Sequence, residues 1–169
     1  MKKIARPLQP TSPPTRTTNG KEAEEAGLLE RFDLSWHLPH LLRRAHFEAE
    51  AQFARVYGET ATSRQMALVV AVMQNPGGSQ ANIARLVGLD DNTCSDLVKR
   101  TLAKGWLEKK KSATDARTWA LAATPAGRRM VNDHSLPLAQ QYVSRVVGIL
   151  TPRQQHQLAI LLRKMLKFH

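Results

Sequence analysis

The sequence contains a single cysteine, Cys94, among 169 residues, which excludes an intramolecular disulfide and a cysteine-based zinc finger. No stretch approaches the roughly 18 consecutive apolar residues of a membrane span. The charged start Met1-Lys2-Lys3 lacks the apolar segment of a secretory signal. The chain also has no Gly-rich phosphate loop, no spaced carboxylate pair and no Ser/His/Asp arrangement. We therefore expect a cytoplasmic protein that is not an enzyme and carries no cofactor.

Acidic residues are few compared with basic ones. The 25 Lys and Arg residues against 14 Asp and Glu residues give a formal net charge of +11, while 42% of residues are hydrophobic, enough for a core. Such a balance favours nucleic acid as the partner, with an anionic membrane surface as the weaker alternative. The densest basic cluster runs from Lys99 to Arg117, where seven bases face only Glu108 and Asp115.

The first 33 residues differ from the rest. Residues 1–21 carry five bases, no acid and four prolines, and residues 22–33 carry five acids and one base. Because such segments bury little apolar surface, we expect residues 1–33 to form a flexible basic arm with an acidic lead-in. The arm either contacts DNA phosphates or serves only as a solubilising tail, and composition leaves both readings open.

Apolar spacing and capping residues predict helices over most of the remaining chain. A long helix should start near residues 36–39 and end at Gly58, and the capping-box spacing of residues 62–65 opens a second helix through Met73. A third helix follows Ser79 and ends at Gly88. Asp90 or Asp91 then caps a fourth helix that ends at Gly105.

The next segments predict a hairpin and two more helices. Residues 106–111 and 118–123 read as strands, with residues 112–117 as the turn between them. Thr124-Pro125 and Thr151-Pro152 each combine an N-cap with proline at the first helical position, so each should open a helix. The predicted fold is mainly α with a small β-hairpin. The predicted order of elements is that of a winged helix-turn-helix: a short helix, a glycine-containing turn, a second helix and a hairpin.

Several segments of this region share a pattern: Gln80-Ala81-Asn82-Ile83-Ala84-Arg85-Leu86-Val87-Gly88-Leu89, Thr93-Cys94-Ser95, Leu97-Val98 and residues 102–109. In these residues the sequence resembles the MarR family of bacterial transcription regulators. The wing signature Asp115-Ala116-Arg117, followed by Leu121-Ala122-Ala123-Thr124-Pro125-Ala126-Gly127, is the most specific part. The resemblance spans residues 38–168. It implies an N-terminal dimerisation helix over 34–60, a DNA-binding domain over 61–124 and C-terminal dimerisation helices over 125–169.

Helical periodicity separates the two faces of the expected recognition helix. Cys94, Leu97, Val98 and Thr101 should face inward, which makes Cys94 a small buried hydrophobe rather than a redox sensor. The outward polar residues can bond base edges or phosphates, although Lys99 and Arg100 could also be only a solvated face. In the wing, the resemblance implies that Arg117 enters the minor groove while Asp115 steadies the loop. The candidate DNA-binding residues are Asn92, Thr93, Ser95, Asp96, Lys99, Arg100, Lys110, Asp115 and Arg117.

Asp96 departs from the family pattern, which commonly has a basic residue at this position. A carboxylate there is repelled by phosphate, so it either accepts a hydrogen bond from a cytosine amino group or orients a neighbouring base. A two-fold homodimer, implied by the resemblance, presents two recognition helices one DNA turn apart and fits a pseudo-palindromic operator. An architectural, sequence-blind DNA-binding dimer is the alternative.

The start of the first helix is rich in histidine, with an arginine close by. No local acid completes a metal site, so we expect no metal. Family members bind aromatic carboxylates where this helix meets the next, and an arginine fork fits a carboxylate. A small aromatic anion, for which a hydroxypyridine carboxylate of the nicotinate-degradation type is the first guess, should therefore release the repressor from DNA. Plain packing or solvation of these side chains is the other reading. The candidate ligand residues are Trp36, His37, His40, Arg44, Gln65 and Met66.

Overall fold

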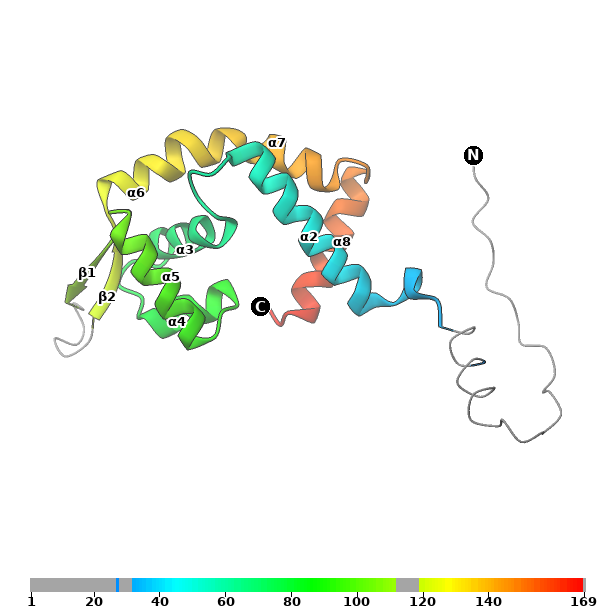
Figure 1. The fold of residues 1–169 in the computed structure, drawn as a ribbon, viewed down its shortest axis with the longest axis horizontal. Coiled ribbons are helices and arrows are strands. Elements are labelled where there is room, and N and C mark those ends of the chain that lie inside the picture. Colours follow the sequence, from blue (N-terminus) through cyan, green and yellow to red (C-terminus); the bar gives the residue numbers. More distant parts are fainter. Residues whose placement is uncertain (1–26, 28–31, 112–118, 169) are drawn as a thin grey trace. The chain divides into compact units, whose positions relative to one another are not determined.

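A computed structural model of the chain describes residues 27, 32–111 and 119–168 (Figure 1). The chain divides into two compact units, residues 1–43 and 44–169, which are treated separately below. The wing turn, together with Asp115 and Arg117, lies outside the described residues. So do residues 1–26 and 28–31, which make up most of the expected basic arm and acidic lead-in.

The described part of the first unit is a short 3-10 helix followed by the start of a long α-helix. Helix η1 covers Leu34–Trp36, and its N-cap Asp33 accepts hydrogen bonds from the backbone N–H and the hydroxyl of Ser35 at 2.8 and 2.6 Å. Helix α2 covers Leu38–Tyr57, so the predicted start near residues 36–39 is confirmed. Pro39 lies in its first turn, where a missing N–H leaves no intrahelical bond unmade.

Three helices enclose the core of the second unit. They are α3 (Ser63–Gln74), α4 (Gln80–Val87) and α5 (Asp91–Ala103), and each begins at a side-chain cap. The predicted capping box of α3 is present, since Thr62 and Gln65 exchange backbone and side-chain hydrogen bonds. Asp90, not Asp91, caps α5. Leu68, Val69, Ile83 and Cys94 are fully buried between these helices, so the helix-turn-helix is held by its own core.

Gly88 makes the turn between α4 and α5. Its φ of 69° lies in the left-handed region, and its N–H bonds to the carbonyls of Ala84 and Arg85 at the end of α4. A residue with a Cβ is strained at that φ, so glycine is the residue that suits this turn. The predicted end of the third helix at Gly88 is confirmed.

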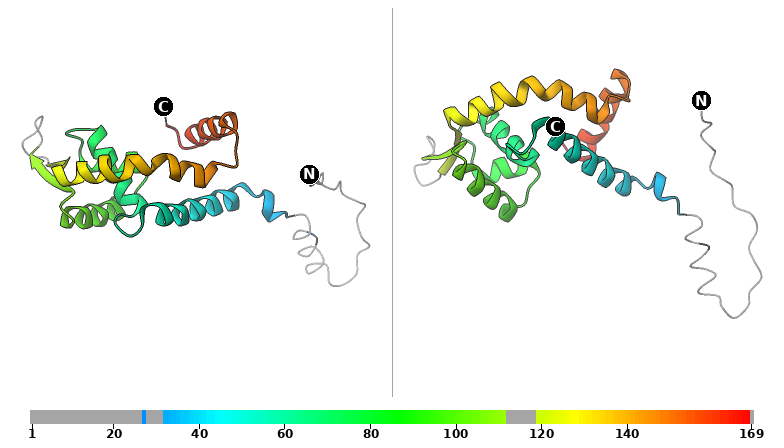
Figure 2. Two further views of the ribbon diagram at one scale, coloured as in Figure 1. Left: turned by 90° about the horizontal axis from the view of Figure 1, so that it is seen from above. Right: turned by 45° about the horizontal axis from the view of Figure 1, so that its top comes forward.

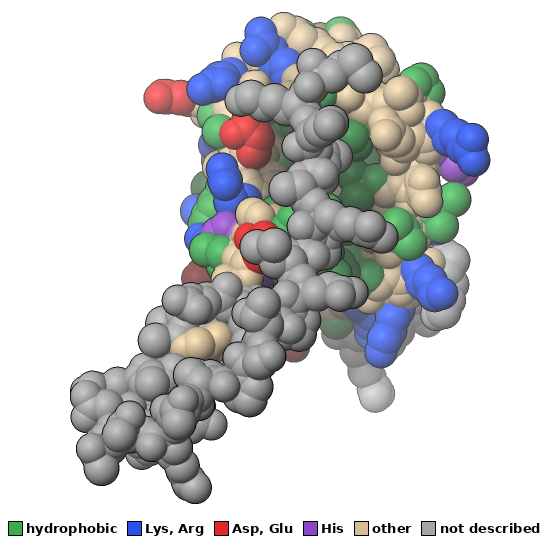
Figure 3. Space-filling view, turned by 90° about the vertical axis from the view of Figure 1, so that its right-hand side faces the viewer, with side chains coloured by type: hydrophobic (Ala, Val, Ile, Leu, Met, Phe, Trp, Pro, Cys, Tyr) green, Lys and Arg blue, Asp and Glu red, His purple; other side chains and the backbone are tan. Residues whose placement is uncertain are grey.

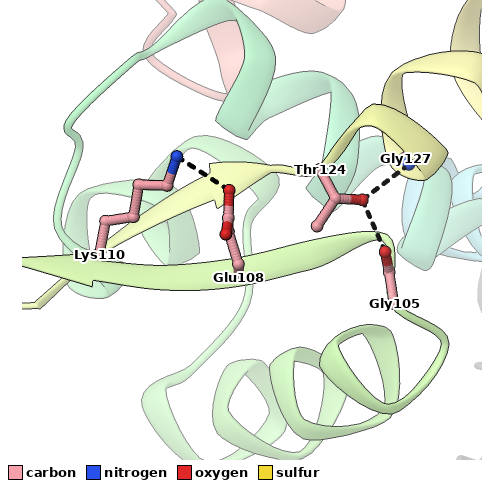
Figure 4. A network of polar contacts seen from close by, with 5 residues as sticks. All are labelled: Gly105, Glu108, Lys110, Thr124 and Gly127. Carbon is pink, nitrogen blue, oxygen red and sulfur yellow. Dashed lines mark hydrogen bonds and ion pairs between the residues drawn. The ribbon is translucent and has the colours of Figure 1, made fainter.

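The predicted hairpin is also present. Strand β1 (Leu107–Lys111) pairs antiparallel with β2 (Trp119–Ala123), with Leu107 opposite Ala123 and Lys111 opposite Trp119. Figure 4 shows how the base of the hairpin is joined to the next helix: the Thr124 hydroxyl donates to the Gly105 carbonyl at 2.6 Å and accepts from the Gly127 N–H at 3.0 Å. A Cβ on Gly127 would overlap the backbone of Trp106, so this close approach requires glycine.

The helix that was predicted to open at Thr124-Pro125 is divided into three parts. Helix α6 covers Pro125–Arg129, the π-helical segment η2 covers Met130–Ser135, and α7 covers Leu136–Val147. They form one continuous run from the hairpin (Figures 1 and 2). Pro137 offers no N–H and its ring crowds the carbonyl four residues earlier, so a wider π turn before it relieves the conflict. The sequence prediction of a single regular helix overlooked this proline.

The last helix, α8, covers Pro152–Met165 and turns back from the end of α7, as Figure 2 shows. It starts after the N-cap Thr151, as the N-cap and Pro signal predicted, and Thr151 also forms a capping box with Gln154. Neither α7 nor α8 contains a buried residue. Within the described residues, no helix is both long and apolar enough to cross a membrane.

Candidate nucleic-acid interface

The inward face of α5 is packed as its periodicity predicted. Cys94, Leu97, Val98 and Thr101 are each at most 2% exposed, and the Thr101 hydroxyl satisfies its donor by bonding the Leu97 carbonyl at 2.7 Å. Burial, reinforced by the nearby charge of Asp91, raises the pKa of the Cys94 thiol. A thiol with a raised pKa and no exposure reacts poorly with oxidants, which agrees with a packing role for Cys94.

The opposite face of α5 presents polar side chains to solvent. Asn92, Asp96, Lys99 and Arg100 are all exposed, and Arg100 is oriented by a 3.4 Å hydrogen bond from its Nε to the Asp96 carbonyl. Because their helix is fixed by the buried face, these four side chains share one rigid surface. A rigid helix with donors, an acceptor and two cations on one side suits the major groove of DNA.

Two further candidates on α5, Thr93 and Ser95, already have partners within the protein. The Thr93 N–H and hydroxyl donate to the two Asp90 oxygens at 2.9 and 2.6 Å, which lowers the pKa of the Asp90 carboxyl. Ser95 is half-buried and accepts a hydrogen bond from Gln80 Nε2 at 2.9 Å. Thr93 therefore serves the cap of α5, while Ser95 is linked to α4.

On strand β1 the three consecutive lysines, Lys109, Lys110 and Lys111, are exposed. Lys110 Nζ lies 2.9 Å from Glu108 Oε1, an ion pair that Figure 4 displays on the hairpin. Both partners are open to solvent, so the pair contributes little to stability and can exchange for a phosphate. Lys104 behaves differently, because its ammonium bonds the Thr60 carbonyl at 2.7 Å and lies 4.6 Å from the Trp106 ring centroid. The basic cluster thus contains one structural lysine.

The six candidate ligand residues are divided between the two units. In the first unit, Trp36 is 72% exposed and His37 lies 4.9 Å from the Phe32 ring, measured between ring centroids. His40 is half-buried, and its Nδ1 accepts from Arg43 Nη2 at 3.1 Å.

In the second unit, Arg44 is exposed on α2 and Met66 is half-buried on α3. Gln65 is buried, and its Oε1 is committed to the Thr62 N–H in the capping box. Its side chain therefore has less freedom to bind a ligand than the sequence alone indicated. Among the described residues, no group of three or more His, Cys, Asp or Glu side chains could hold a metal ion.

Sequence reasoning missed Gln80 as a member of this surface. It is the first residue of α4, and its amide reaches the outward side of α5 through Ser95. Its position after the Ser79 cap placed it at the start of α4, but no sequence signal paired it with Ser95, fifteen residues later. Since helix spacing alone does not show which side chains meet between two crossing helices, only the structure reveals this contact.

Residues 62–127 match a family described as a winged helix DNA-binding domain. The chain is 26% identical over 136 residues to the HTH-type transcriptional repressor NicR of Pseudomonas putida, covering 80% of this chain and 85% of that protein. It is 31% identical over 115 residues to a putative transcriptional regulatory protein for the hcr operon of Thauera aromatica, covering 66% and 69%.

A solved structure shares the fold. The chain is similar to Bordetella bronchiseptica BpsR, described by its mechanism for regulation of DNA binding by 6-hydroxynicotinic acid. The TM-score is 0.73 at 27% identity, over 79% of this chain and 96% of that one. These matches, like the sequence resemblance, point to DNA-binding regulators and not to enzymes.

Proposed function

The chain belongs to the MarR family of winged-helix transcriptional regulators, and on this premise we propose that it is a homodimeric, sequence-specific repressor. In this proposal the dimer binds a pseudo-palindrome and is released by a small aromatic carboxylate. The observation that carries the DNA-binding part is α5: a polar, cation-bearing outer face on a helix whose inner face is fully buried.

We assign direct readout to the exposed residues of α5. Asn92 can bond an adenine edge, and Lys99 and Arg100 can bond guanine or phosphate. Asp96 is exposed between them. An ionised carboxylate can only accept hydrogen bonds, so on a base edge it suits a donor such as the cytosine amino group. We also propose that Lys110 on β1 neutralises a phosphate, and that Arg117 enters the minor groove with Asp115 steadying its loop.

One substitution distinguishes the two possible roles of Asp96, reading a base and repelling phosphate. Asp96→Asn keeps the shape and removes the charge, and we expect it to relax preference at one base pair of each half-site. An equal gain of affinity on every DNA sequence would instead show that Asp96 acts only as a repulsive charge. The measurement is affinity for an operator set in which each base pair is changed in turn.

The dimer is supported by the apolar surface of α8. Leu161 is 57% and Met165 53% exposed, with Leu158, Ile160 and Leu166 also open to solvent. On the face that Figure 3 shows, apolar side chains reach the surface and Lys and Arg side chains are more widespread than Asp and Glu. Exposed leucines in series favour a protein contact, and a second copy of the chain supplies the matching face.

Competition between DNA sequences tests the DNA-binding part. A gel-shift titration of the purified protein with DNA from the region upstream of its own gene should be reversed by unlabelled specific DNA. Scrambled DNA of the same composition should compete at least about a thousandfold less well. Equal competition by both would favour the alternative, an architectural DNA-binding dimer.

The effector part depends on Arg44. Its guanidinium is exposed on α2, and a planar fork of N–H donors fits a carboxylate in a bidentate manner. We propose that Met66 on α3 covers the ring, while the ligand roles of Trp36, His37, His40 and Gln65 stay predictions from the sequence. The similarity to BpsR, whose DNA binding is regulated by 6-hydroxynicotinic acid, supports a hydroxypyridine carboxylate.

Release from DNA requires only a modest preference of the effector. In one state of the dimer the recognition helices cannot reach successive major grooves. A ligand that binds this state more tightly by about 1.4 kcal/mol lowers DNA affinity tenfold. Titration calorimetry with 6-hydroxynicotinate, salicylate and protocatechuate tests this part. We expect binding of one of them, weakened at least tenfold by Arg44→Ala and by His40→Ala.

Arg64→Ala is the matched control for these variants, since Arg64 is an exposed arginine on α3 outside the candidate set. It should leave effector binding unchanged. Binding that none of the variants affects would discard this site, while no binding by any of the three compounds would leave an effector-blind regulator.

A further inference from the structure

A hydrogen bond joins the two helices of the helix-turn-helix at the surface proposed to face DNA. Gln80 Nε2 donates to Ser95 Oγ at 2.9 Å, and both side chains are half-buried. Gln80 lies at the first position of α4 and Ser95 in the second turn of α5. The bond therefore links a residue outside the recognition helix to a candidate base-reading residue on it.

The backbone positions of both residues are fixed. Gln80 follows Ser79, which caps α4 by accepting from the Asn82 N–H at 3.3 Å and forms an isolated β-bridge with Ala120 on β2. Ser95 follows Cys94, which is fully buried. Since neither backbone can shift readily, the amide of Gln80 fixes the Ser95 hydroxyl in direction as well as in position.

Counting donors and acceptors shows what the hydroxyl still offers. A serine hydroxyl has one proton and two lone pairs. The Gln80 amide occupies one lone pair, and among the described residues the Ser95 proton has no acceptor. Thr101, on the buried side of the same helix, contrasts with this because its hydroxyl donates to the carbonyl four residues earlier.

We propose that Gln80 is a positioning residue for base readout, holding the Ser95 hydroxyl as a hydrogen-bond donor to one base of each half-site. The acceptors that a major groove offers to such a donor are N7 and O6 of guanine, N7 of adenine and O4 of thymine. This inference rests on the proposed function, because it assumes that α5 enters the major groove of a specific site.

The test compares base preference among variants of the full-length protein. Ser95→Ala removes the donor, Gln80→Met removes the positioning amide while keeping the length of the side chain, and the third variant combines both changes. Gln74→Met is the matched control, since Gln74 is an exposed glutamine at the end of α3. Each protein is selected against randomised half-sites, and its affinity is then measured for the operator and for its single base-pair variants.

We expect Ser95→Ala and Gln80→Met to relax preference at the same base pair, each by about three- to tenfold, with the double variant no worse than Ser95→Ala alone. Gln80→Glu provides a second variant. Its carboxylate would accept the Ser95 proton and leave none for the base, so preference at that base pair should be weaker than in the wild type. Thermal unfolding of each variant verifies that the fold is kept. Gln74→Met should bind as the wild type does.

Three results would overturn the inference. Additive effects of the two changes, or effects at different base pairs, would mean that Gln80 and Ser95 act independently. A uniform loss on all sequences for Gln80→Met would make Gln80 a phosphate contact. If the wild-type protein itself does not distinguish sequences, the proposed function and this inference are both wrong, whereas discrimination without coupling contradicts the inference alone.

Discussion

Helices α5 and α8 have nearly the same length, 13 and 14 residues, but very different surroundings. Helix α5 buries four side chains in the core of the winged helix, whereas α8 buries none. Both carry an apolar stripe at helical spacing, so periodicity alone does not distinguish them. The difference shows that the winged helix buries its apolar stripe within its own chain, whereas the apolar stripe of α8 is left exposed, as the proposed dimer requires.

The largest effect should come from a substitution on α8, whose apolar stripe is exposed. Leu161→Glu places a charge on the exposed stripe of α8, where the fold of the single chain tolerates it. We expect a monomer at micromolar concentration and operator affinity lowered by about 10²- to 10⁴-fold, because two linked half-site contacts become one. Sedimentation velocity and gel shift measure the two effects.

A matched substitution sharpens this comparison. Leu86→Glu alters a leucine that is 44% exposed on α4, within the winged helix, and should leave the dimer mass unchanged. A dimeric Leu161→Glu protein would remove α8 from the interface.

Substitutions in the buried core of the winged helix should lower the stability of the single chain. Leu68→Ala empties a fully buried position on α3, and we expect the free energy of unfolding to fall by about 2–5 kcal/mol. The same change at Leu86 should lower it by less than about 1 kcal/mol, since that side chain is partly solvated. Chemical denaturation measures both values. Similar losses at the two sites would contradict the assignment of this core.

Contacts at the DNA surface should have intermediate effects. Arg117→Ala is expected to weaken operator binding by about 1–3 kcal/mol if it enters a minor groove. Lys99→Ala should weaken binding and reduce the slope of affinity against salt by about one unit if it neutralises a phosphate. Affinity measured between low and high salt separates the two. Unchanged binding in both folded variants would exclude this docking.

The smallest effect is expected at the cap of α5. Hydrogen bonds from Thr93 lower the pKa of the Asp90 carboxyl in the folded state. A carboxyl with a depressed pKa stabilises the fold above its unfolded pKa, and this contribution is lost as the pH falls through the folded value. The thermal midpoint of the wild type should therefore fall more in acid than that of Asp90→Asn. Parallel curves for the two proteins would show that the cap has no pH-dependent role.

Much of this architecture follows from local sequence signals. Helix ends depend on interactions over a few residues, so they can be predicted from the local sequence. Examples are the caps Ser79, Thr124 and Thr151 and the left-handed glycine Gly88. The inward stripe of α5 was predictable because one helical period repeats through it.

Other features did not follow from these local signals. The π turn before Pro137 reflects how one proline is accommodated within a longer helix. The Gln80–Ser95 bond depends on the crossing of two helices, and the link of Lys104 to Thr60 spans 44 residues. Sequence spacing assigned Lys104 to the general basic cluster because nothing local distinguishes a structural lysine from a solvated one.

Hydroxyl-radical footprinting tests the central claim, sequence-specific binding by a two-fold dimer, most directly. Purified protein on DNA from upstream of its own gene should protect two half-sites whose centres lie about one helical turn apart, roughly 10–10.5 base pairs. Scrambled DNA at the same protein concentration should remain unprotected. Uniform protection of both DNAs, or a single protected patch without a symmetric partner, would contradict the account.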